Sequence, residues 1–391
     1  MSAKTDQVIR PDEIEKDFSL KTLFVCGLFA LSAFSVHVQA ANFADKDKPF
    51  DQYHWVTTHN SYEKINQNLA EMPRQLRDGV RGFMLDLYTN DKKQGLERIK
   101  VCHKTIACYG PLGEQLKNEF IPFLKSNGSE VVTIFFETYV QRSDLQQVFD
   151  SMPELADFTF DPANFNSPGW PTLKDMASKN NRLILMTDKR DVSGKYTVGN
   201  KTITVLFDRD WVTQNHWDTL GPAASNIKAA HNFSCPTRWP DIPLNTRTVA
   251  SSTGKQWKRL FMMNQFHSVT STIFDSAAYD NNLTYLMLRT ANCGVTPNFI
   301  AINNYRNGDA FPYARRSAKG ACTCGKRKMR AGKATPSVSF PTNPEPLCCL
   351  PRAVRKMKHA RCRFPGSQVE QGSRFTITAE AAWRMTTPSS T

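Results

Sequence analysis

Histidines, carboxylates and one carboxamide stand beside short apolar runs in the first half of the chain. The residues concerned are His59, Asn60, Asp86, His103, Glu137, Asp188 and Lys189. Two histidines can share general acid and general base work, because imidazole titrates near neutrality. An amide and two carboxylates offer the oxygen ligands that Ca²⁺ prefers, and a lysine can offset charge on an anionic phosphorus. These residue types favour cleavage of a phosphodiester.

Eight apolar runs rich in β-branched and aromatic residues recur, separated by segments with helical periodicity. The runs are Trp55–Thr58, Gly82–Leu87, Ile99–Cys102, Val131–Phe136, Arg182–Met186, Thr202–Phe207, Phe261–Asn264 and Phe299–Ile302. The helical candidates are Gly113–Ser126, Asp144–Ser151 with Ser143 as its cap, and Ala277–Leu288. Apolar strands alternating with helices predict a parallel sheet covered on both faces, and eight of them predict a (β/α)8 TIM-type barrel, regular or irregular.

The polar residues acquire a common location in this fold. The carboxyl ends of barrel strands meet on one face, so we expect these side chains to form one site. An open doubly wound sheet is the alternative, although no GxGxxG turn follows the first run. The sequence contains no GxSxG elbow and no nucleotide-binding loop, which argues against a serine hydrolase and against a kinase.

Four motifs, in this order and spacing, resemble the catalytic X-domain of phosphatidylinositol-specific phospholipases C. They are THNSY at Thr58–Tyr62, GVRGFMLDLY at Gly79–Tyr88, VCHK at Val101–Lys104 and TIFFE at Thr133–Glu137. Later segments that resemble the same superfamily are Pro171–Met176, Leu183–Lys189 and Pro297–Tyr305, which extends the likeness over about Phe50 to Phe311. The resemblance implies a phosphoric diester hydrolase that separates phosphate from diacylglycerol, with the inositol 2-hydroxyl attacking phosphorus to give a cyclic phosphate.

The resemblance also implies roles for single residues. His59 matches the histidine that acts on the attacking hydroxyl, and His103 matches the one that protonates the leaving group. The remaining matches are Asn60, Asp86 and Glu137 to ligands of the calcium-dependent branch, and Lys189 to a phosphate-contacting lysine.

Three positions depart from the family pattern. The calcium-dependent branch has a glutamate where Met84 stands, so one ligand is missing. The metal-independent bacterial branch has an arginine where Tyr88 stands and an aspartate where Asn60 stands. We expect a weakened Ca²⁺ site, because water replaces a carboxylate more readily than it replaces an arginine.

The substrate stays open, because no clear set of inositol-reading residues is apparent in the sequence. A phospholipase C acting on a phosphatidylinositol-like lipid at a membrane surface is our first hypothesis. A barrel phosphodiesterase acting on glycerophosphodiesters or sphingomyelin is the second. A non-catalytic barrel that binds lipid or headgroup is the third, and Met84 permits it.

The first 40 residues have the pattern of a signal peptide. Leu23–Val36 is an apolar run of 14 residues after Lys21, and Val38-Gln39-Ala40 suits cleavage before Ala41. We therefore expect a secreted or periplasmic protein; a buried helix or a membrane anchor is the alternative. The acidic stretch before the run is unusual for a signal, so translation could begin further in.

Export favours disulfide bonds among the nine cysteines that follow the predicted signal peptide. We predict the pairs Cys102/Cys108 and Cys235/Cys293, with buried free thiols as the alternative. The spacing of these four cysteines does not fit a zinc module.

The positive charge is concentrated in the last 77 residues. The chain carries a formal net charge of +14, and Arg315–Thr391 holds 16 Lys and Arg against 3 Asp and Glu. The body is nearly neutral, which argues against a specific nucleic-acid partner. We predict a barrel over 41–314 and a disordered basic tail over 315–391 that binds anionic surfaces through its charge. We also expect the protein to be a monomer. A metal site at Cys322, Cys324, Cys348 and Cys349 and an out-of-frame translation product are the alternatives for the tail.

Overall fold

The computed structural model describes residues 46–104, 107–166, 168–220, 234–249, 257–269 and 277–318. The predicted signal peptide and nearly all of the predicted basic tail lie outside these ranges. Among the residues described, no helix is both long and apolar enough to cross a membrane. The last described helix, α11 (Ala310–Ala318), continues past the boundary predicted at residue 314.

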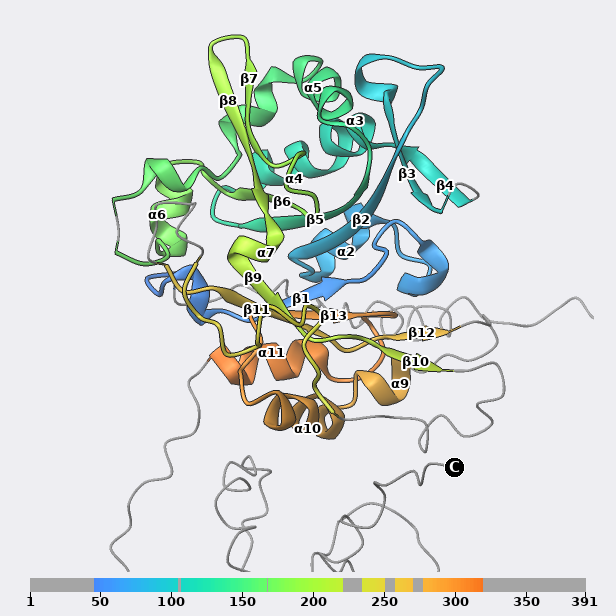
Figure 1. The fold of residues 1–391 in the computed structure, drawn as a ribbon, viewed down its shortest axis with the longest axis vertical. Coiled ribbons are helices and arrows are strands. Elements are labelled where there is room, and N and C mark those ends of the chain that lie inside the picture. Colours follow the sequence, from blue (N-terminus) through green and yellow to red (C-terminus); the bar gives the residue numbers. More distant parts are fainter. Residues whose placement is uncertain are drawn as a thin grey trace, which may run out of the picture. The chain divides into compact units, whose positions relative to one another are not determined.

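The strands are β1 (Trp55–Thr58), β2 (Gly82–Thr89), β3 (Ile99–His103), β4 (Ala107–Pro111), β5 (Val132–Tyr139), β6 (Leu183–Thr187), β7 (Gly194–Val198), β8 (Lys201–Phe207), β9 (Val212–Gln214), β10 (Asp218–Leu220), β11 (Leu260–Asn264), β12 (His267–Val269) and β13 (Phe299–Ile302). The helices before α11 are α2 (Met72–Asp78), α3 (Leu112–Gln115), α4 (Ile121–Ser126), α5 (Arg142–Asp150), α6 (Leu173–Ser178), α7 (Asp208–Trp211), α9 (Ala277–Asp280) and α10 (Leu283–Cys293). Figure 1 shows α3, α4 and α5 on one side of the strands and α10 and α11 on the other.

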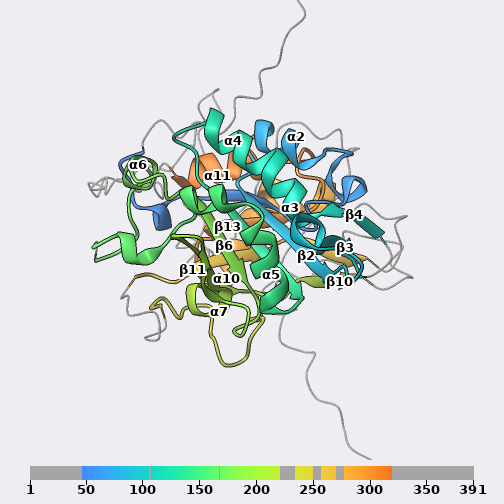
Figure 2. The ribbon, with the colours of Figure 1, turned by 90° about the horizontal axis from the view of Figure 1, so that it is seen from above.

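One sheet contains eight parallel strands in the order of a (β/α)8 barrel. Within the described residues the order is β8-β6-β5-β2-β1-β13-β11-β9, so the first strand lies between the second and the last. In Figure 2 the strands occupy the middle, with helices around them. The described ladders do not join β8 to β9, and the barrel is irregular at that point. The predicted barrel is confirmed, and the open doubly wound sheet is wrong.

The side chains along the strands alternate between two apolar clusters, as a curled sheet requires. Trp55, Phe135 and Met186 belong to an inner aromatic-rich cluster. Val56 and Phe136, one residue further along their strands, belong to the outer cluster that packs against the helices. This alternation decides which polar residues beyond the apolar runs face the interior.

The expectation that Ile99–Cys102 is a barrel strand is wrong. The segment forms β3, which pairs antiparallel with β2 and continues as a hairpin into β4. The missing barrel strand is β9, which has only three residues and follows α7 directly. Apolar runs reveal burial but not strand direction, so the sequence could not distinguish the two cases.

The helical predictions are confirmed in position and corrected at their ends. Residues 112–126 are helical throughout, with π-helical turns at Leu116–Phe120 between α3 and α4. The cap predicted at Ser143 is wrong: α5 begins at Arg142, and the Asp144 carboxylate accepts a hydrogen bond from the Gln141 amide at 3.0 Å. The candidate over 277–288 is two helices, α9 and α10.

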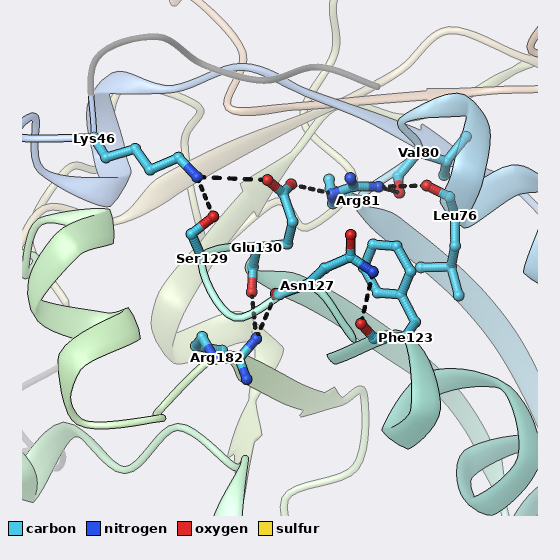
Figure 3. Close-up of polar contacts among 9 residues, drawn as sticks. All are labelled: Lys46, Leu76, Val80, Arg81, Phe123, Asn127, Ser129, Glu130 and Arg182. Carbon is cyan, nitrogen blue, oxygen red and sulfur yellow. Dashed lines mark hydrogen bonds and ion pairs between the residues drawn. The ribbon is translucent and has the colours of Figure 1, made fainter. Parts of the chain in front are cut away.

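Buried charges at the amino ends of the strands are paired with one another (Figure 3). Arg81, which precedes β2, donates to the Glu130 carboxylate before β5 at 2.8 Å. Arg182, before β6, donates to the Glu130 and Asn127 carbonyls at 3.2 and 2.9 Å. Lys46 lies 3.7 Å from the Glu130 carboxylate and joins the start of the described chain to this cluster. This face of the barrel is therefore organised for stability.

Candidate active site

A single open cavity gathers the predicted site residues at the carboxyl ends of the parallel strands. Its empty volume, including solvent at the mouth, is about 860 Å³. Six of the seven residues noted in the sequence line it, namely His59, Asn60, Asp86, His103, Glu137 and Asp188. Met84 also lines it, so the departure from the family pattern lies within the site.

His59 is held by the barrel itself. Its amide donates to the Ile302 carbonyl at 2.9 Å, and its ring stacks on Phe266 with centroids 3.7 Å apart and planes 2° from parallel. Nδ1 donates to the Asn303 amide oxygen at 3.0 Å, which leaves Nε2 with its lone pair. Desolvation lowers the pKa of His59 to about 4, with the Asn303 hydrogen bond acting in the opposite direction. The imidazole is therefore neutral at pH 7 and suited to accept a proton.

The next residue, Asn60, has a left-handed backbone with φ 46°. Asparagine tolerates this region better than most residues, and the following Ser61 amide donates to the Met84 carbonyl at 3.0 Å. The turn lets the loop leave β1 sharply while the Asn60 side chain stays at the cavity.

His103 reaches the same cavity from the β3–β4 hairpin. Nδ1 donates to the Glu63 carboxylate at 2.5 Å, and the Asn60 amide nitrogen lies 3.5 Å from the same ring atom. Glu63 is buried, with 7% of its side chain exposed, whereas 43% of the His103 side chain is exposed. The Glu63 carboxylate holds the ring through Nδ1, so Nε2 is the ring nitrogen left to exchange a proton with a bound substrate.

Two carboxylates stand side by side opposite the histidines. Asp86 and Glu137 are register partners on β2 and β5. Burial, followed by the charge of Glu137, raises the pKa of Asp86 to about 7. Tyr62 hydrogen-bonds to Asp86, and burial together with this carboxylate raises the pKa of the phenol. A cation bound between the carboxylates would relieve their repulsion.

The oxygen donors available to such a cation are few. Asn60, Asp86 and Glu137 supply one amide and two carboxylates, all hard ligands. No group of three or more His, Cys, Asp or Glu side chains in the described ranges could hold a metal ion. The set fits Ca²⁺ only as an open site that water and substrate complete, in keeping with the methionine at position 84.

The cationic side chain at the cavity is Arg238, not Lys189. Asp188 and Lys189 follow β6, and of these two residues only Asp188 lines the cavity. Its carboxylate accepts a hydrogen bond from the Thr138 backbone amide at 2.8 Å. Arg238 lines the cavity and donates to the Gln214 side-chain oxygen at 2.8 Å. No motif in the sequence marks Arg238, because this residue lies between β10 and β11, away from the strand motifs.

A second polar group lines the cavity near the opening between β8 and β9. Asp208, directly after β8, and Asn264, at the end of β11, each have one buried oxygen without a hydrogen-bond partner in the described part of the chain. Burial raises the pKa of Asp208 to about 7, and the Arg238 charge opposes this shift. Water or a ligand hydroxyl in the cavity would satisfy these two acceptors.

The residues that orient the two histidines, Glu63 and Asn303, were not among the site residues predicted from the sequence. Glu63 lies one residue beyond THNSY, and Asn303 lies within the noted segment Pro297–Tyr305. Their proximity to His103 and His59 depends on loops that only the folded barrel brings together. Phe266 follows β11 in the same way.

Residues 47–217 match the family model described as PI-PLC X 1. A PI-PLC X domain-containing protein of Arabidopsis thaliana is 27% identical over 285 residues, covering 67% of this chain; the chain spans 60% of that relative. The phosphatidylinositol-specific phospholipase C from Listeria monocytogenes is 16% identical, with a TM-score of 0.47 over 72% of this chain and 97% of its own. A mutant of the Staphylococcus aureus enzyme of the same name is 13% identical, with a TM-score of 0.42 over 66% of this chain and 87% of its own. The resemblance to the PI-PLC X domain inferred from the motifs is confirmed.

Proposed function

We propose that this protein is a phosphoric diester hydrolase of the phospholipase C type, acting on a phosphatidylinositol-like lipid at a membrane surface. The observation that carries the proposal is that two histidines line one cavity and that each bonds through Nδ1 to a different kind of group, an amide oxygen for His59 and a carboxylate for His103. His59 is neutral beside an amide, and His103 stands against a buried carboxylate. A base and an acid prepared in this way suit the two proton transfers of phosphodiester cleavage.

The first transfer involves His59. Its Nε2 removes the proton from a hydroxyl of the headgroup as the oxygen attacks phosphorus, which forms a P–O bond and gives a cyclic phosphate. Asn303 keeps the proton on Nδ1, and Phe266 keeps the ring in its plane. Both contacts hold the lone pair of Nε2 toward the cavity.

The second transfer involves His103. As the P–O bond to diacylglycerol breaks, the Nε2 proton moves to the departing oxygen, so a neutral alcohol leaves. Glu63 orients the His103 ring for this transfer by accepting a hydrogen bond from Nδ1. Water then opens the cyclic phosphate with the roles of the histidines reversed, as microscopic reversibility requires.

Charge on the phosphorane has two sources of stabilisation within the site. Arg238 lines the cavity and is held by Gln214. Asn60, Asp86 and Glu137 would hold a Ca²⁺ ion, which would supply Lewis-acid stabilisation of the phosphoryl oxygens. A contribution from Lys189 remains a proposal from the sequence and has no support in the described lining.

The second polar group favours a hydroxylated headgroup. The unpartnered oxygens of Asp208 and Asn264 would accept hydrogen bonds from headgroup hydroxyls. Choline has no such donor in its quaternary ammonium group, so this observation favours an inositol lipid over sphingomyelin. It applies equally to a hydroxylated glycerophosphodiester.

We further propose that the protein is exported. Both disulfides predicted from the sequence, Cys102–Cys108 and Cys235–Cys293, are present in the structure. Disulfides persist in oxidising compartments, which supports a secreted or periplasmic location.

To test the proposal, the full-length protein is incubated with three substrates: phosphatidylinositol vesicles, sphingomyelin vesicles and soluble glycerophosphoinositol. Each incubation is carried out with Ca²⁺ and then with a chelator. Phosphorus NMR should detect a cyclic inositol phosphate from phosphatidylinositol, and loss of the signal in the chelator would support the Ca²⁺ site. The His59→Ala variant should be inactive, and His216→Ala, an exposed histidine outside the cavity lining, should be active. Headgroup binding without turnover would replace the proposal with the non-catalytic hypothesis.

A further inference from the structure

The hairpin that carries His103 stands at the margin of the parallel sheet. Strand β3 pairs with β2 from Ile99 to Val101, and this ladder ends two residues before His103. In the described residues β4 pairs with β3 alone. The general acid therefore sits near the tip of a two-stranded ribbon, and such ribbons are weakly stable by themselves.

A disulfide closes this ribbon directly beside the histidine. Cys102 and Cys108 are cross-strand partners and are covalently joined, and the next pair along the hairpin is His103 with Ala107. The bond therefore spans the two strands one residue from the general acid. A covalent link of this kind removes the freedom of the strands to separate.

The noncovalent contacts around His103 depend on where the hairpin lies. The Tyr62 hydroxyl donates to the Cys102 carbonyl at 3.4 Å, and the Tyr62 and Tyr109 rings lie 5.3 Å apart. Glu63, in the loop that follows β1, accepts a hydrogen bond from His103 Nδ1. If the strands separate, Cys102 and His103 lose their fixed distance from this loop, so the Glu63 contact depends on the disulfide.

We propose that the Cys102–Cys108 disulfide is a positioning device for the general acid, so that breaking it abolishes protonation of the leaving group while proton removal by His59 continues. This inference rests on the proposed phospholipase C activity. The disulfide touches no reacting atom and acts through His103. Because Cys108 is exposed whereas Cys102 is buried, the bond can be attacked from solvent at its Cys108 sulfur.

Reduction by an external dithiol gives a balanced route to the open form. One thiolate of the reagent attacks the Cys108 sulfur and the Cys102 thiolate departs and takes up a proton. The second thiol of the reagent then attacks the mixed disulfide, which releases the Cys108 thiol and leaves the reagent as a cyclic disulfide. Two electrons pass from the reagent to the protein disulfide.

The second disulfide provides a matched control. Cys235–Cys293 links positions 58 residues apart and joins the segment at 234–249 to the end of α10. Neither cysteine belongs to the cavity lining. A Cys235→Ser/Cys293→Ser variant loses a disulfide without touching the hairpin.

The experiment compares two leaving groups on the same inositol phosphate, diacylglycerol and p-nitrophenol. An alkoxide needs protonation to depart and p-nitrophenolate does not. We expect Cys102→Ser/Cys108→Ser to lower kcat about 10²-fold on the diacylglycerol ester and less than about 3-fold on the nitrophenyl ester. His103→Ala should give the same pattern, and combining it with the cysteine changes should cause no further loss.

Dithiothreitol provides a second route in case the serine variant fails to fold. Before reduction, the Cys235→Ser/Cys293→Ser variant should cleave both esters. Dithiothreitol should abolish its cleavage of the diacylglycerol ester only. The activities of the Cys102→Ser/Cys108→Ser variant should not change with dithiothreitol. Equal losses on both esters, or no loss on either, would overturn the proposal. If the unmodified protein cleaves neither ester, the proposed function fails and NMR decides the positioning: NOE contacts between the His103 ring and Glu63 should vanish only when the Cys102–Cys108 bond is broken. Contacts that survive overturn the inference.

Discussion

The two ends of the parallel strands treat charge in opposite ways. At the amino ends, Arg81 and Glu130 are buried against each other, and Arg182 donates to backbone carbonyls. At the carboxyl ends, Asp86 faces another carboxylate, and a buried oxygen of Asp208 has no partner in the described residues. A folded chain gains nothing from unsatisfied charge unless a ligand uses it. The contrast separates a face built for stability from a face built for binding and chemistry.

The largest effect we expect is the loss of His59. His59→Ala should lower kcat/KM by about 10²–10⁴-fold, because it removes the general base. The unfolding midpoint in urea should change little, since the residue is at the functional end. Full activity in a folded variant would remove the distinction between the two faces and the proposed mechanism together.

At the opposite end, Glu130→Gln should act on stability alone. The change leaves Arg81 buried without its counter-charge, which costs about 3–5 kcal/mol in the free energy of unfolding. Urea denaturation measures this loss, and kcat under native conditions should stay near its original value. The control is Glu71→Gln, whose exposed pair with Lys64 contributes about 1 kcal/mol or less.

Asp86→Asn sharpens the comparison because it should weaken function and favour folding. The raised pKa of Asp86, about 7, means that its contribution to stability is complete below the ordinary value of 3.8 and is lost as the pH rises to 7. The variant should therefore lose less stability than the unmodified protein between pH 4 and pH 8.

Calcium supplies the functional half of this prediction. Ca²⁺ should raise the Tm of the unmodified protein and raise it less in Asp86→Asn and in Glu137→Gln, because each variant lacks one charged ligand. Thermal melts with Ca²⁺ or chelator measure the difference. A Tm and an activity that ignore the chelator would contradict the Ca²⁺ assignment and direct attention to Arg238.

A smaller effect should follow from Phe266→Leu, which exposes the face of the His59 ring. Desolvation holds the pKa of His59 at about 4, so its loss should move the acid limb of the kcat/KM profile toward 6.5. Activity at pH 5, relative to pH 8, should fall by up to about 10-fold. Phe311→Leu, on α11 and outside the cavity lining, should leave the profile in place.

The smallest effect should come from ending the chain after Ala321. Every described element lies before this point, whereas ending at Ala314 would cut α11. Turnover of a soluble ester should not change, and binding to anionic vesicles at low salt should weaken as basic residues are removed. Loss of turnover by the shorter chain, measured on the soluble ester, would show that the tail contributes to the folded body.

Most of the strands and the residue types at the cavity could be predicted from the amino-acid sequence alone. Runs such as Trp55–Thr58 and Phe299–Ile302 are strands within the predicted bounds, because burial on both faces imposes continuous apolar residues. His59, Asp86 and Glu137 line one cavity because they stand at the carboxyl ends of the parallel strands β1, β2 and β5, which meet on one face. Both disulfide pairs predicted among the cysteines are present in the structure.

The direction of β3, the place of β9 and the surroundings of each histidine depend on contacts that form only when the chain folds. His103 is at the site because a hairpin folds back across the sheet, not because a barrel strand ends there. Arg238 and Phe266 reach the cavity through loops whose path depends on long-range packing. Local sequence encodes burial and turn preference, whereas the contacts among Glu63, Asn303 and the histidines arise from loop closure between strands far apart in the chain.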